Sequence, residues 1–168
     1  MSKNPLVTIG MPMYNSEKFI TQAIISTLQQ TFTDFELIIT DDGSTDRSIK
    51  LVKSFDDPRI KLLSDGMNKG ISYRLNQQVE LATGKYYLRM DSDDIMFPNR
   101  IEEQVKYLEA HPEVDVVGTT AVIIDNDDKI IKYSKTSVPL DENEAVKVNV
   151  FIHPTVSGKK KKKKNLPY

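Results

Sequence analysis

Aspartates gather in two segments of the sequence, and both follow apolar runs typical of buried strands. The run at 35–40 leads into DDGSTD at 41–46, and the run at 85–90 leads into DSDD at 91–94. Like charges in a partly desolvated crevice repel one another, and a cation or a hydrogen-bond donor relieves that cost. A hard divalent ion fits, because Mg²⁺ prefers one or two carboxylates together with water and phosphate oxygens. Such clusters also cap helices and make turns, but two of them at neighbouring strand ends favour a site.

The elements that must position these loops alternate between strands and helices, which predicts an α/β fold with a mostly parallel sheet flanked by helices. Strands are expected at 6–10, 35–40, 59–63 and 85–90. Helices are expected after an N-cap at Asn15 or Ser16, from Ser44 or Thr45, over 71–82 until Gly84, and with Pro98 in a first turn. A β-rich segment follows, with strands at 114–119, 121–125 and 129–133, a turn at 126–128 and a short helix at 143–150.

In an open parallel sheet the ligand crevice lies beyond the carboxyl ends of the strands. The loop after the first strand, expected at 11–15, therefore faces the same crevice as the two acidic loops. This places Pro12, Tyr14 and Asn15 beside the carboxylates.

The composition is that of one soluble globular domain, expected at 1–158, with a lysine-rich tail at 159–168. The chain has no cysteine, which excludes disulfides and thiolate metal sites and favours a reducing cytosol. No apolar stretch is long enough for a signal peptide or a membrane span. Six of the 23 basic residues form the tract 159–164, so the remaining chain is acidic, which disfavours nucleic acid as a partner. For the tract, a solvated charge run or non-native residues are favoured over lipid binding.

Four motifs follow one another along the chain: P-x-Y-N at 12–15, DDGSTD at 41–46, N-x-G at 68–70, and GKY at 84–86 leading to MDSDD at 90–94. Each is weak alone, but the set at these spacings is specific, and HPTV at 153–156 adds a later element. In this order the chain resembles the family 2 glycosyltransferases. The resemblance implies the GT-A fold, a Rossmann-like sheet with a small β-rich segment after the D-x-D loop. It also implies inverting transfer of a sugar from a nucleotide-sugar donor, with UDP favoured.

The resemblance implies a role for each site residue. Asp42 corresponds to the carboxylate that accepts a hydrogen bond from uracil N3, which is apt because an ionised carboxylate only accepts and uracil N3 carries a proton. Tyr14 is similar to residues that line the nucleoside pocket, with Pro12 and Asn15 beside it, although a role as a core aromatic is nearly as well supported. Asp93 is expected to bind Mn²⁺ or Mg²⁺ directly, and Asp91 to lie near the ribose or the water shell of the metal. The metal would neutralise charge on the leaving nucleoside diphosphate.

Four further residues keep two interpretations each. Arg74 and Lys69 follow the N-x-G motif closely enough to reach phosphate, although exposed side chains are commoner. Asp94 either joins the site or, as we favour, caps the helix after Pro98. His153 either contacts phosphate or metal or is merely hydrogen-bonded in its loop.

One part of the family pattern is not found. The general base of inverting members lies in a Glu-Asp element after the HPT segment, so it is expected beyond Tyr168. The resemblance implies a saccharide or lipid-linked glycan acceptor, surface polysaccharide or glycan synthesis, and a cytoplasmic location at the inner face of the membrane.

The main alternative is a non-catalytic nucleotide-sugar-binding module. A phosphorylation-type signalling domain fits less well, because its acidic pair would follow the first strand, where Tyr14 and Asn15 stand. A nucleotidyltransferase is disfavoured because no glycine-rich phosphate loop follows that strand. The donor sugar, the acceptor and the oligomeric state do not follow from the sequence.

Overall fold

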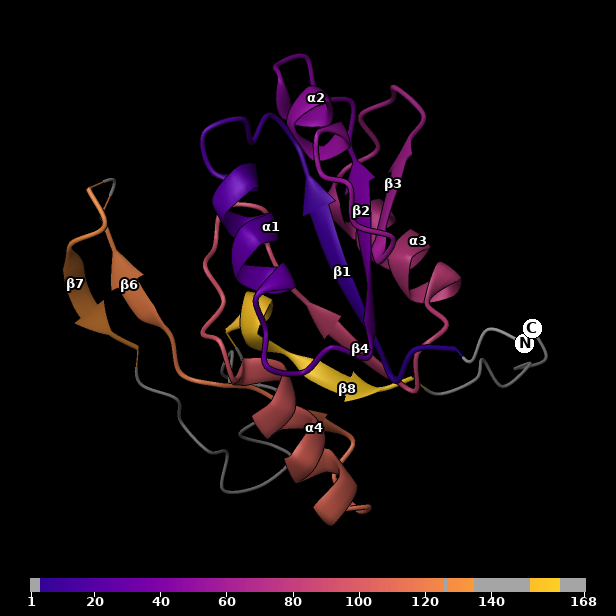
Figure 1. The fold of residues 1–168 in the computed structure, drawn as a ribbon, viewed down its shortest axis with the longest axis vertical. Helices are drawn as coiled ribbons and strands as arrows, with labels where there is room; N and C mark the ends of the chain where they lie inside the picture. The colour runs from indigo at the N-terminus through magenta and orange to yellow at the C-terminus, as the bar shows by residue number, and fades with distance from the viewer. Residues whose placement is uncertain (1–3, 126, 135–151, 161–168) are drawn as a thin grey trace.

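A six-stranded sheet forms the centre of the computed structural model, which describes residues 4–125, 127–134 and 152–160 (Figure 1). The strand order is β3-β2-β1-β4-β8-β5. The strands are β1 (Val7–Met13), β2 (Phe35–Asp41), β3 (Ile60–Ser64), β4 (Tyr86–Arg89), β5 (Val116–Val117) and β8 (Ser157–Lys159). The first four strands of this order are parallel, whereas β8 is antiparallel to both β4 and β5. The α/β fold with a mostly parallel sheet, expected from the sequence, is confirmed.

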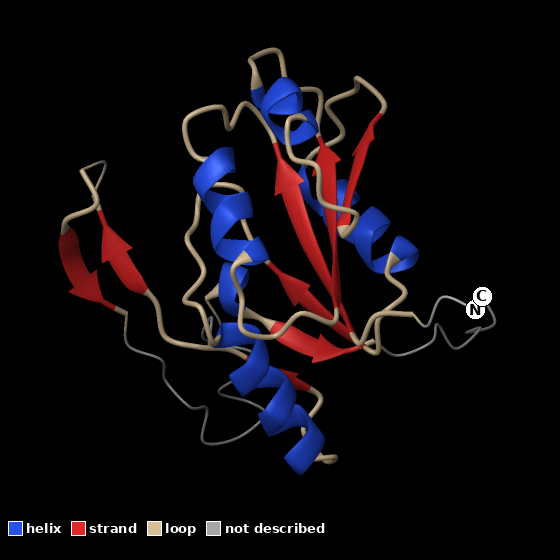
Figure 2. Ribbon diagram, viewed as in Figure 1, coloured by secondary structure: helices blue, strands red, loops and turns tan. Residues whose placement is uncertain are grey.

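Helices flank this sheet on both faces (Figure 2). They are α1 (Ile20–Leu28), α2 (Ser48–Lys53), α3 (Ile71–Leu81) and α4 (Arg100–Ala110). The chain moves outward from β1 to β2 and β3 and then returns past β1 to β4. Because such crossovers are right-handed, this reversal places α3 on the face opposite α1. It also creates a switch point between β1 and β4, which is where sheets of this kind bind ligands.

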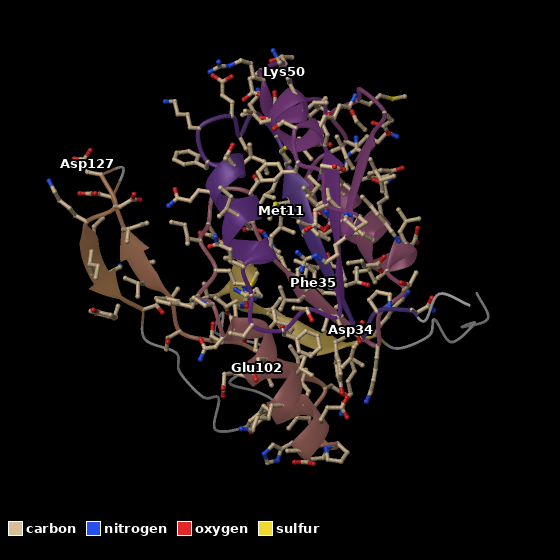
Figure 3. All side chains as sticks on the ribbon, viewed as in Figure 1. Met11, Asp34, Phe35, Lys50, Glu102 and Asp127 are labelled. Atoms are coloured by element: carbon tan, nitrogen blue, oxygen red, sulfur yellow. The ribbon has the colours of Figure 1, made fainter. Side chains whose placement is uncertain are left out.

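The two central strands are buried along their whole length. Every residue of β1 and β2 is buried, which explains why both read as continuous apolar runs. Met11 lies in the interior, whereas Lys50 and Asp127 lie at the periphery (Figure 3). Apolar side chains of both strands form one core cluster with α1 and α4 that includes Ile24 and Ile101. The sheet is therefore a rigid base for the loops that follow its strands.

The other face of the sheet carries a polar layer under α3. Gln78 is fully buried, and its Nε2 donates to Thr40 Oγ1 at 2.6 Å. Its Oε1 accepts a hydrogen bond from the Tyr87 hydroxyl at 2.9 Å. A Cβ at Gly10 would lie 2.1 Å from that hydroxyl oxygen, so any larger residue at this point of β1 would displace the Tyr87–Gln78 pair.

Strand β1 extends three residues beyond its predicted end at residue 10. Its pairing with β2 continues to Met13 opposite Asp41, so 11–13 belong to the strand and not to a loop. Proline is tolerated at position 12 because the ladder to β4 ends at Gly10. The carbonyl of Gly10 accepts from Met90 N–H, so the backbone of Pro12, two residues on, also faces the unpaired side. The loop that faces the site therefore begins at Tyr14.

Helix α1 begins later than the predicted caps require. Asn15 and Ser16 were expected to cap it, but α1 starts at Ile20 with Phe19 as N-cap. The two polar side chains bond instead to distant loops: Asn15 Oδ1 accepts from Thr45 N–H at 2.9 Å, and the Ser16 hydroxyl lies 2.8 Å from that of Ser92. Long-range partners have therefore replaced local capping.

Helices α2 and α4 also begin later than predicted. Ser44 and Thr45 belong to the loop, and α2 starts at Ser48, whose N–H donates to Asp46 Oδ1 at 2.9 Å. Helix α4 has Asn99 as N-cap, so Pro98 precedes its first turn. The carbonyl of Pro98 accepts from Thr31 N–H at 2.9 Å, which anchors the approach to α4 beside the end of α1.

The β-rich segment after the D-x-D loop consists of a hairpin and a sheet edge. The hairpin strands β6 (Val122–Ile124) and β7 (Ile130–Tyr133) project from the body of the molecule (Figure 1). Strand β5 is shorter than the expected 114–119. Strand β8 was not predicted, because Ser-Gly-Lys has weak strand propensity and its pairing partners are distant. Lys159, assigned to the tail, is the last residue of β8, and the helix predicted at 143–150 lies outside the described residues.

Among the described helices, none has the length and apolar character needed to cross a membrane.

Candidate functional site

A cavity of about 260 Å³ opens at the carboxyl ends of β1, β2 and β4, on the switch point. It is lined by Pro12, Met13, Tyr14, Asp42, Ile71, Arg74, Asp91, Ser92 and Asp93. This set holds every residue that the sequence assigned to the site except Asn15. Met13, Ile71 and Ser92 were not assigned, although Met13 and Ser92 lie within motifs that were and Ile71 directly follows the N-x-G motif. We call this cavity the switch-point pocket.

Asn15 is not among the residues that line the switch-point pocket, so its assignment as a binding residue stays a prediction. Its φ of 47° is a left-handed conformation that asparagine tolerates. Its backbone N–H donates to Ser44 Oγ at 3.0 Å, and its side chain accepts from Thr45 N–H. Asn15 therefore ties the loop after β1 to the loop after β2 and so positions Tyr14 beside Asp42.

Asp42 is held by three protein donors at the base of the pocket. Its Oδ1 accepts from Lys69 N–H at 2.8 Å and from Arg74 Nε at 2.9 Å, and its Oδ2 accepts from Gly70 N–H at 3.0 Å. Burial acts to raise the pKa of Asp42, but these hydrogen bonds outweigh it and hold the pKa below its usual value. An ionised carboxylate offers about four lone-pair sites, so one acceptor site on Oδ2 remains for a ligand.

Arg74 is not the exposed arginine that is the commoner case, since only 1% of its surface is accessible. Besides Asp42, its guanidinium donates to both oxygens of Asp65, at 2.6 and 3.3 Å, and to Met67 O and Gln77 Oε1. These contacts occupy the guanidinium on all sides. The guanidinium of Arg74 thus bridges Asp42 and Asp65, and Asp65 fixes the orientation in which Arg74 holds Asp42.

Lys69 and Asp65 lie next to Asp42 and Arg74 but outside the pocket lining. The Lys69 ammonium pairs with Asp65 at 2.7 Å and lies 4.8 Å from the centre of the Tyr73 ring. With its ammonium engaged by Asp65 and Tyr73, Lys69 is not directed toward a phosphate group, the role considered for it. Asp65 was not predicted as a site residue, although an aspartate directly after the third strand occupies the same kind of position as Asp42 and Asp91.

The two carboxylates of the D-x-D loop have different surroundings. Asp91 forms a two-point ion pair with Arg89, with Nε to Oδ1 at 2.8 Å and Nη2 to Oδ2 at 3.0 Å. Asp93 is exposed at the pocket, and within the described ranges no hydrogen bond or ion pair engages its carboxylate. The hydroxyl of Ser92, between them, lies 2.8 Å from that of Ser16 and so fixes the loop against the turn after β1.

Asp94 does not cap the following helix, which corrects the interpretation that the sequence favoured. Asn99 is the N-cap of α4, and Asp94 is half-buried, outside the pocket lining. Burial, with the nearby charges of Asp93 and Asp91, raises the pKa of Asp94 to about 6. His153, in the 3-10 turn His153–Thr155, is exposed and also outside the pocket lining.

The donor set of the pocket fits a cation that arrives with a phosphorylated ligand. In the described part of the chain, no group of three or more acidic or histidine side chains is arranged to hold a metal ion. The open carboxylate is that of Asp93, with Asp91 beside it. One or two carboxylates suffice for Mg²⁺ or Mn²⁺ when phosphate oxygens and water complete the coordination.

A family model described as "Glycosyl transferase family 2" matches residues 8–167. The chain belongs to this family. EpsE of Bacillus subtilis is 39% identical over 128 residues, which are 74% of this chain and 46% of that protein. The UDP-Glc:alpha-D-GlcNAc-diphosphoundecaprenol beta-1,3-glucosyltransferase WfgD of Escherichia coli is 40% identical over 103 residues, 61% of this chain and 41% of WfgD. The chain spans about half the length of the curated family 2 relatives it matches.

Two solved structures share the fold. TarS 1–349 of S. aureus in complex with UDP-GlcNAc has a TM-score of 0.74 at 23% identity, covering 92% of this chain and 45% of that one. The mannosyltransferase PcManGT of Pyrobaculum calidifontis, in complex with GDP-Man and Mn²⁺, has a TM-score of 0.69 at 21% identity, covering 94% and 45%. The GT-A, Rossmann-like fold expected from the sequence is therefore confirmed.

Proposed function

We propose that this chain forms the donor-binding half of a glycosyltransferase that transfers a sugar from a UDP-sugar with the help of Mn²⁺ or Mg²⁺. One observation carries the proposal: a single pocket joins the ionised Asp42, anchored by protein donors, to the open carboxylate of Asp93. The family assignment supplies the reaction class. The UDP and UDP-GlcNAc complexes of TarS, and the UDP-Glc in the name of WfgD, support uridine as the nucleoside.

At the base-binding end of the pocket, Asp42 selects the nucleobase. The remaining acceptor site on its Oδ2 suits the N3–H of uracil, whereas cytosine presents an acceptor there and would meet a second acceptor. Tyr14 and Ile71 are 52% and 53% exposed on the pocket wall and offer apolar surface to the base and the ribose. Pro12, next to the last residue of β1, is buried and also lines the pocket. In this proposal Arg74 acts through Asp42 and not by contact with phosphate.

At the diphosphate end, Asp93 holds the divalent cation, and Asp91 lies toward the ribose or the water shell. The bound cation supplies neutralisation of the charge that develops on the leaving nucleoside diphosphate. The Ser16–Ser92 contact keeps the D-x-D loop in register with the turn after β1. The protein would therefore contribute one carboxylate, and phosphate oxygens and water would supply the other ligands.

For the whole protein we propose inverting transfer, with a general base supplied from outside the described residues. The acceptor proposed is a saccharide or a lipid-linked glycan in surface polysaccharide or glycan synthesis. The lipid diphosphate acceptor in the name of WfgD supports this choice.

Calorimetry with UDP, UDP-sugars, CDP and GDP, each with and without Mn²⁺, tests the donor proposal. We expect UDP and UDP-sugars to bind with Mn²⁺ and CDP to bind at least tenfold more weakly. Binding that is indifferent to both base and cation would overturn the proposal.

A donor-hydrolysis assay distinguishes the proposed glycosyltransferase from the rival function, a non-catalytic nucleotide-sugar-binding module. The assay compares this chain with a chain extended to the length of its relatives. Turnover in the extended chain supports the transferase, and binding without turnover in both supports the module.

A further inference from the structure

Arg89 on β4 engages both oxygens of Asp91 at once. The two contacts measure 2.8 and 3.0 Å, and the side chains are only 18% and 23% exposed. A bidentate, partly buried pair of this kind has strong directional preference, unlike a surface ion pair. Both oxygens of Asp91 are therefore already bound within the protein.

The backbone of Arg89 is fixed from two sides. Its N–H donates to Val156 O at 2.9 Å, next to β8, and its carbonyl accepts from Arg100 Nη2 at 3.1 Å. Residues two apart on a strand point to the same side, which aims Arg89 at Asp91 just beyond the strand end. The pair is thus set by the sheet and not by a mobile loop.

Asp93, two residues further on, stands in contrast, because its carboxylate has no hydrogen bond or ion pair in the described parts of the chain. If Asp91 were equally open, the two carboxylates would form an anionic pair able to attract a divalent cation alone. With Arg89 in place, the charge of Asp91 is cancelled. Among the described residues that line the switch-point pocket, one unpaired carboxylate is then left for the cation, which is too few ligands to hold it firmly without phosphate oxygens.

We propose that Arg89 is a positioning residue that withholds Asp91 from the cation, so that cation and nucleotide bind together and the cation binds weakly alone. The inference rests on the proposed function and adds that binding of the cation depends on binding of the nucleotide. In thermodynamic terms Arg89 increases the coupling between Mn²⁺ and UDP, because it weakens the binding of Mn²⁺ to the nucleotide-free chain.

Titration calorimetry with MnCl₂ on the nucleotide-free chain tests this inference, followed by UDP at saturating Mn²⁺. Arg89→Met should strengthen the binding of Mn²⁺ alone by about tenfold, because it frees a carboxylate beside Asp93. Mn²⁺ should correspondingly enhance the affinity for UDP by a smaller factor than in the wild type. Arg89→Gln, which keeps a donor for one oxygen of Asp91, should strengthen Mn²⁺ binding by about threefold and keeps the test usable if the Met variant does not fold.

Two further variants separate this role from a structural one. The double variant Arg89→Met with Asp91→Asn removes the freed charge and should return Mn²⁺ binding to within about twofold of the wild type. Arg59→Met is the matched control: Arg59 forms an equivalent pair with Asp57, at 3.0 and 2.8 Å with side chains 26% and 21% exposed, at the other end of the sheet. It should leave Mn²⁺ binding unchanged.

Mn²⁺ binding that is unchanged or weaker in both single Arg89 variants would overturn the inference, because loss of a purely structural contact weakens binding or leaves it alone. Failure of the wild type to bind UDP with Mn²⁺ would instead overturn the proposed function. The two failures are therefore distinguishable in one set of titrations.

Discussion

Glu36, at the amino end of the central sheet, and Asp94, at its carboxyl end, have pKa values shifted in opposite directions. At the amino end, the buried Glu36 accepts from Thr8 Oγ1 at 2.6 Å, from Lys61 Nζ at 2.6 Å, and from Thr83 N–H and Oγ1 at 2.8 and 2.7 Å. Burial acts to raise the pKa of Glu36, but these donors lower it to about 2. At the carboxyl end, burial and neighbouring charges raise the pKa of Asp94 to about 6.

The number of protein donors on each carboxylate indicates whether it stabilises the fold or is available to a ligand. Glu36 is surrounded by protein donors and fastens the segment before β4 to β1 and β2. Asp42 is intermediate, with three protein donors and one acceptor site left. Asp93 is at the far extreme, open to the pocket with no partner among the residues the structure describes. In the proposed function, the nucleotide's cation would relieve the local repulsion between carboxylates at the carboxyl end.

The largest expected effect is that of Asp93→Asn at the carboxyl end. Without this carboxylate the cation loses its direct protein ligand, so donor turnover should fall by about 10²- to 10³-fold, about 3 to 4 kcal/mol in the barrier. The assay is donor hydrolysis or transfer in a chain extended to the length of its relatives. Asp56→Asn, at an exposed aspartate away from the pocket, is the matched control and should retain turnover. Equal turnover in both variants would show that Asp93 does not hold the cation.

At the amino end, Glu36→Gln should lower the free energy of unfolding by about 3 kcal/mol, because it leaves buried donors facing an amide that accepts less strongly. Urea unfolding measures this change. Calorimetry on the same variant should show UDP affinity within about twofold of the wild type. A large loss of UDP affinity would contradict the separation of the two sheet ends.

Asp42→Asn should lower both the free energy of unfolding and the UDP affinity, because Asp42 is bound by protein donors and also keeps one acceptor site for the ligand. We expect UDP affinity to fall by about 10- to 100-fold, in line with about 1.5 to 3 kcal/mol for a hydrogen bond to a charged group. Asp65→Asn, which loosens Arg74 without removing the acceptor for uracil, should destabilise the loop and lower UDP affinity less. If both variants lost UDP affinity equally, the carboxylate of Asp42 would have no direct contact with the base.

The pH dependence of stability provides the smallest effect. The folded pKa of Glu36 is about 2, below its ordinary 4.5, so its contribution is fully present above about pH 4.5 and is lost as the pH falls toward 2. Between pH 5 and pH 3 the wild type should lose about 2 kcal/mol more than Glu36→Gln in urea unfolding. Parallel losses in the two proteins would mean that Glu36 is not the group responsible.

The central strands and much of the pocket were predictable from the sequence, because both depend on local patterns of residues. Strand β2 was placed to within one residue, because strands buried on both faces are continuous apolar runs. Asp42, Asp91 and Asp93 follow strand ends, and parallel strands bring such residues to one edge, where the structure joins them in the switch-point pocket.

What the sequence did not predict depends on partners far apart in the chain. Ser16 was expected to cap a helix, but it bonds to Ser92, 76 residues away. Strand β8 was missed because its few residues form a strand only through pairing with β4 and β5. Arg89 was missed although the spacing of two between Arg89 and Asp91 on a strand would place both on one side. Helix caps and ion pairs therefore need the fold before they can be assigned.

A structure of this chain with UDP and Mn²⁺ tests the central claim most directly. We predict uracil N3 within hydrogen-bond distance of Asp42 Oδ2, and Mn²⁺ bound by Asp93 and the diphosphate while Asp91 remains on Arg89. A nucleotide bound outside the switch-point pocket, or a cation with no contact to Asp93, would contradict the account.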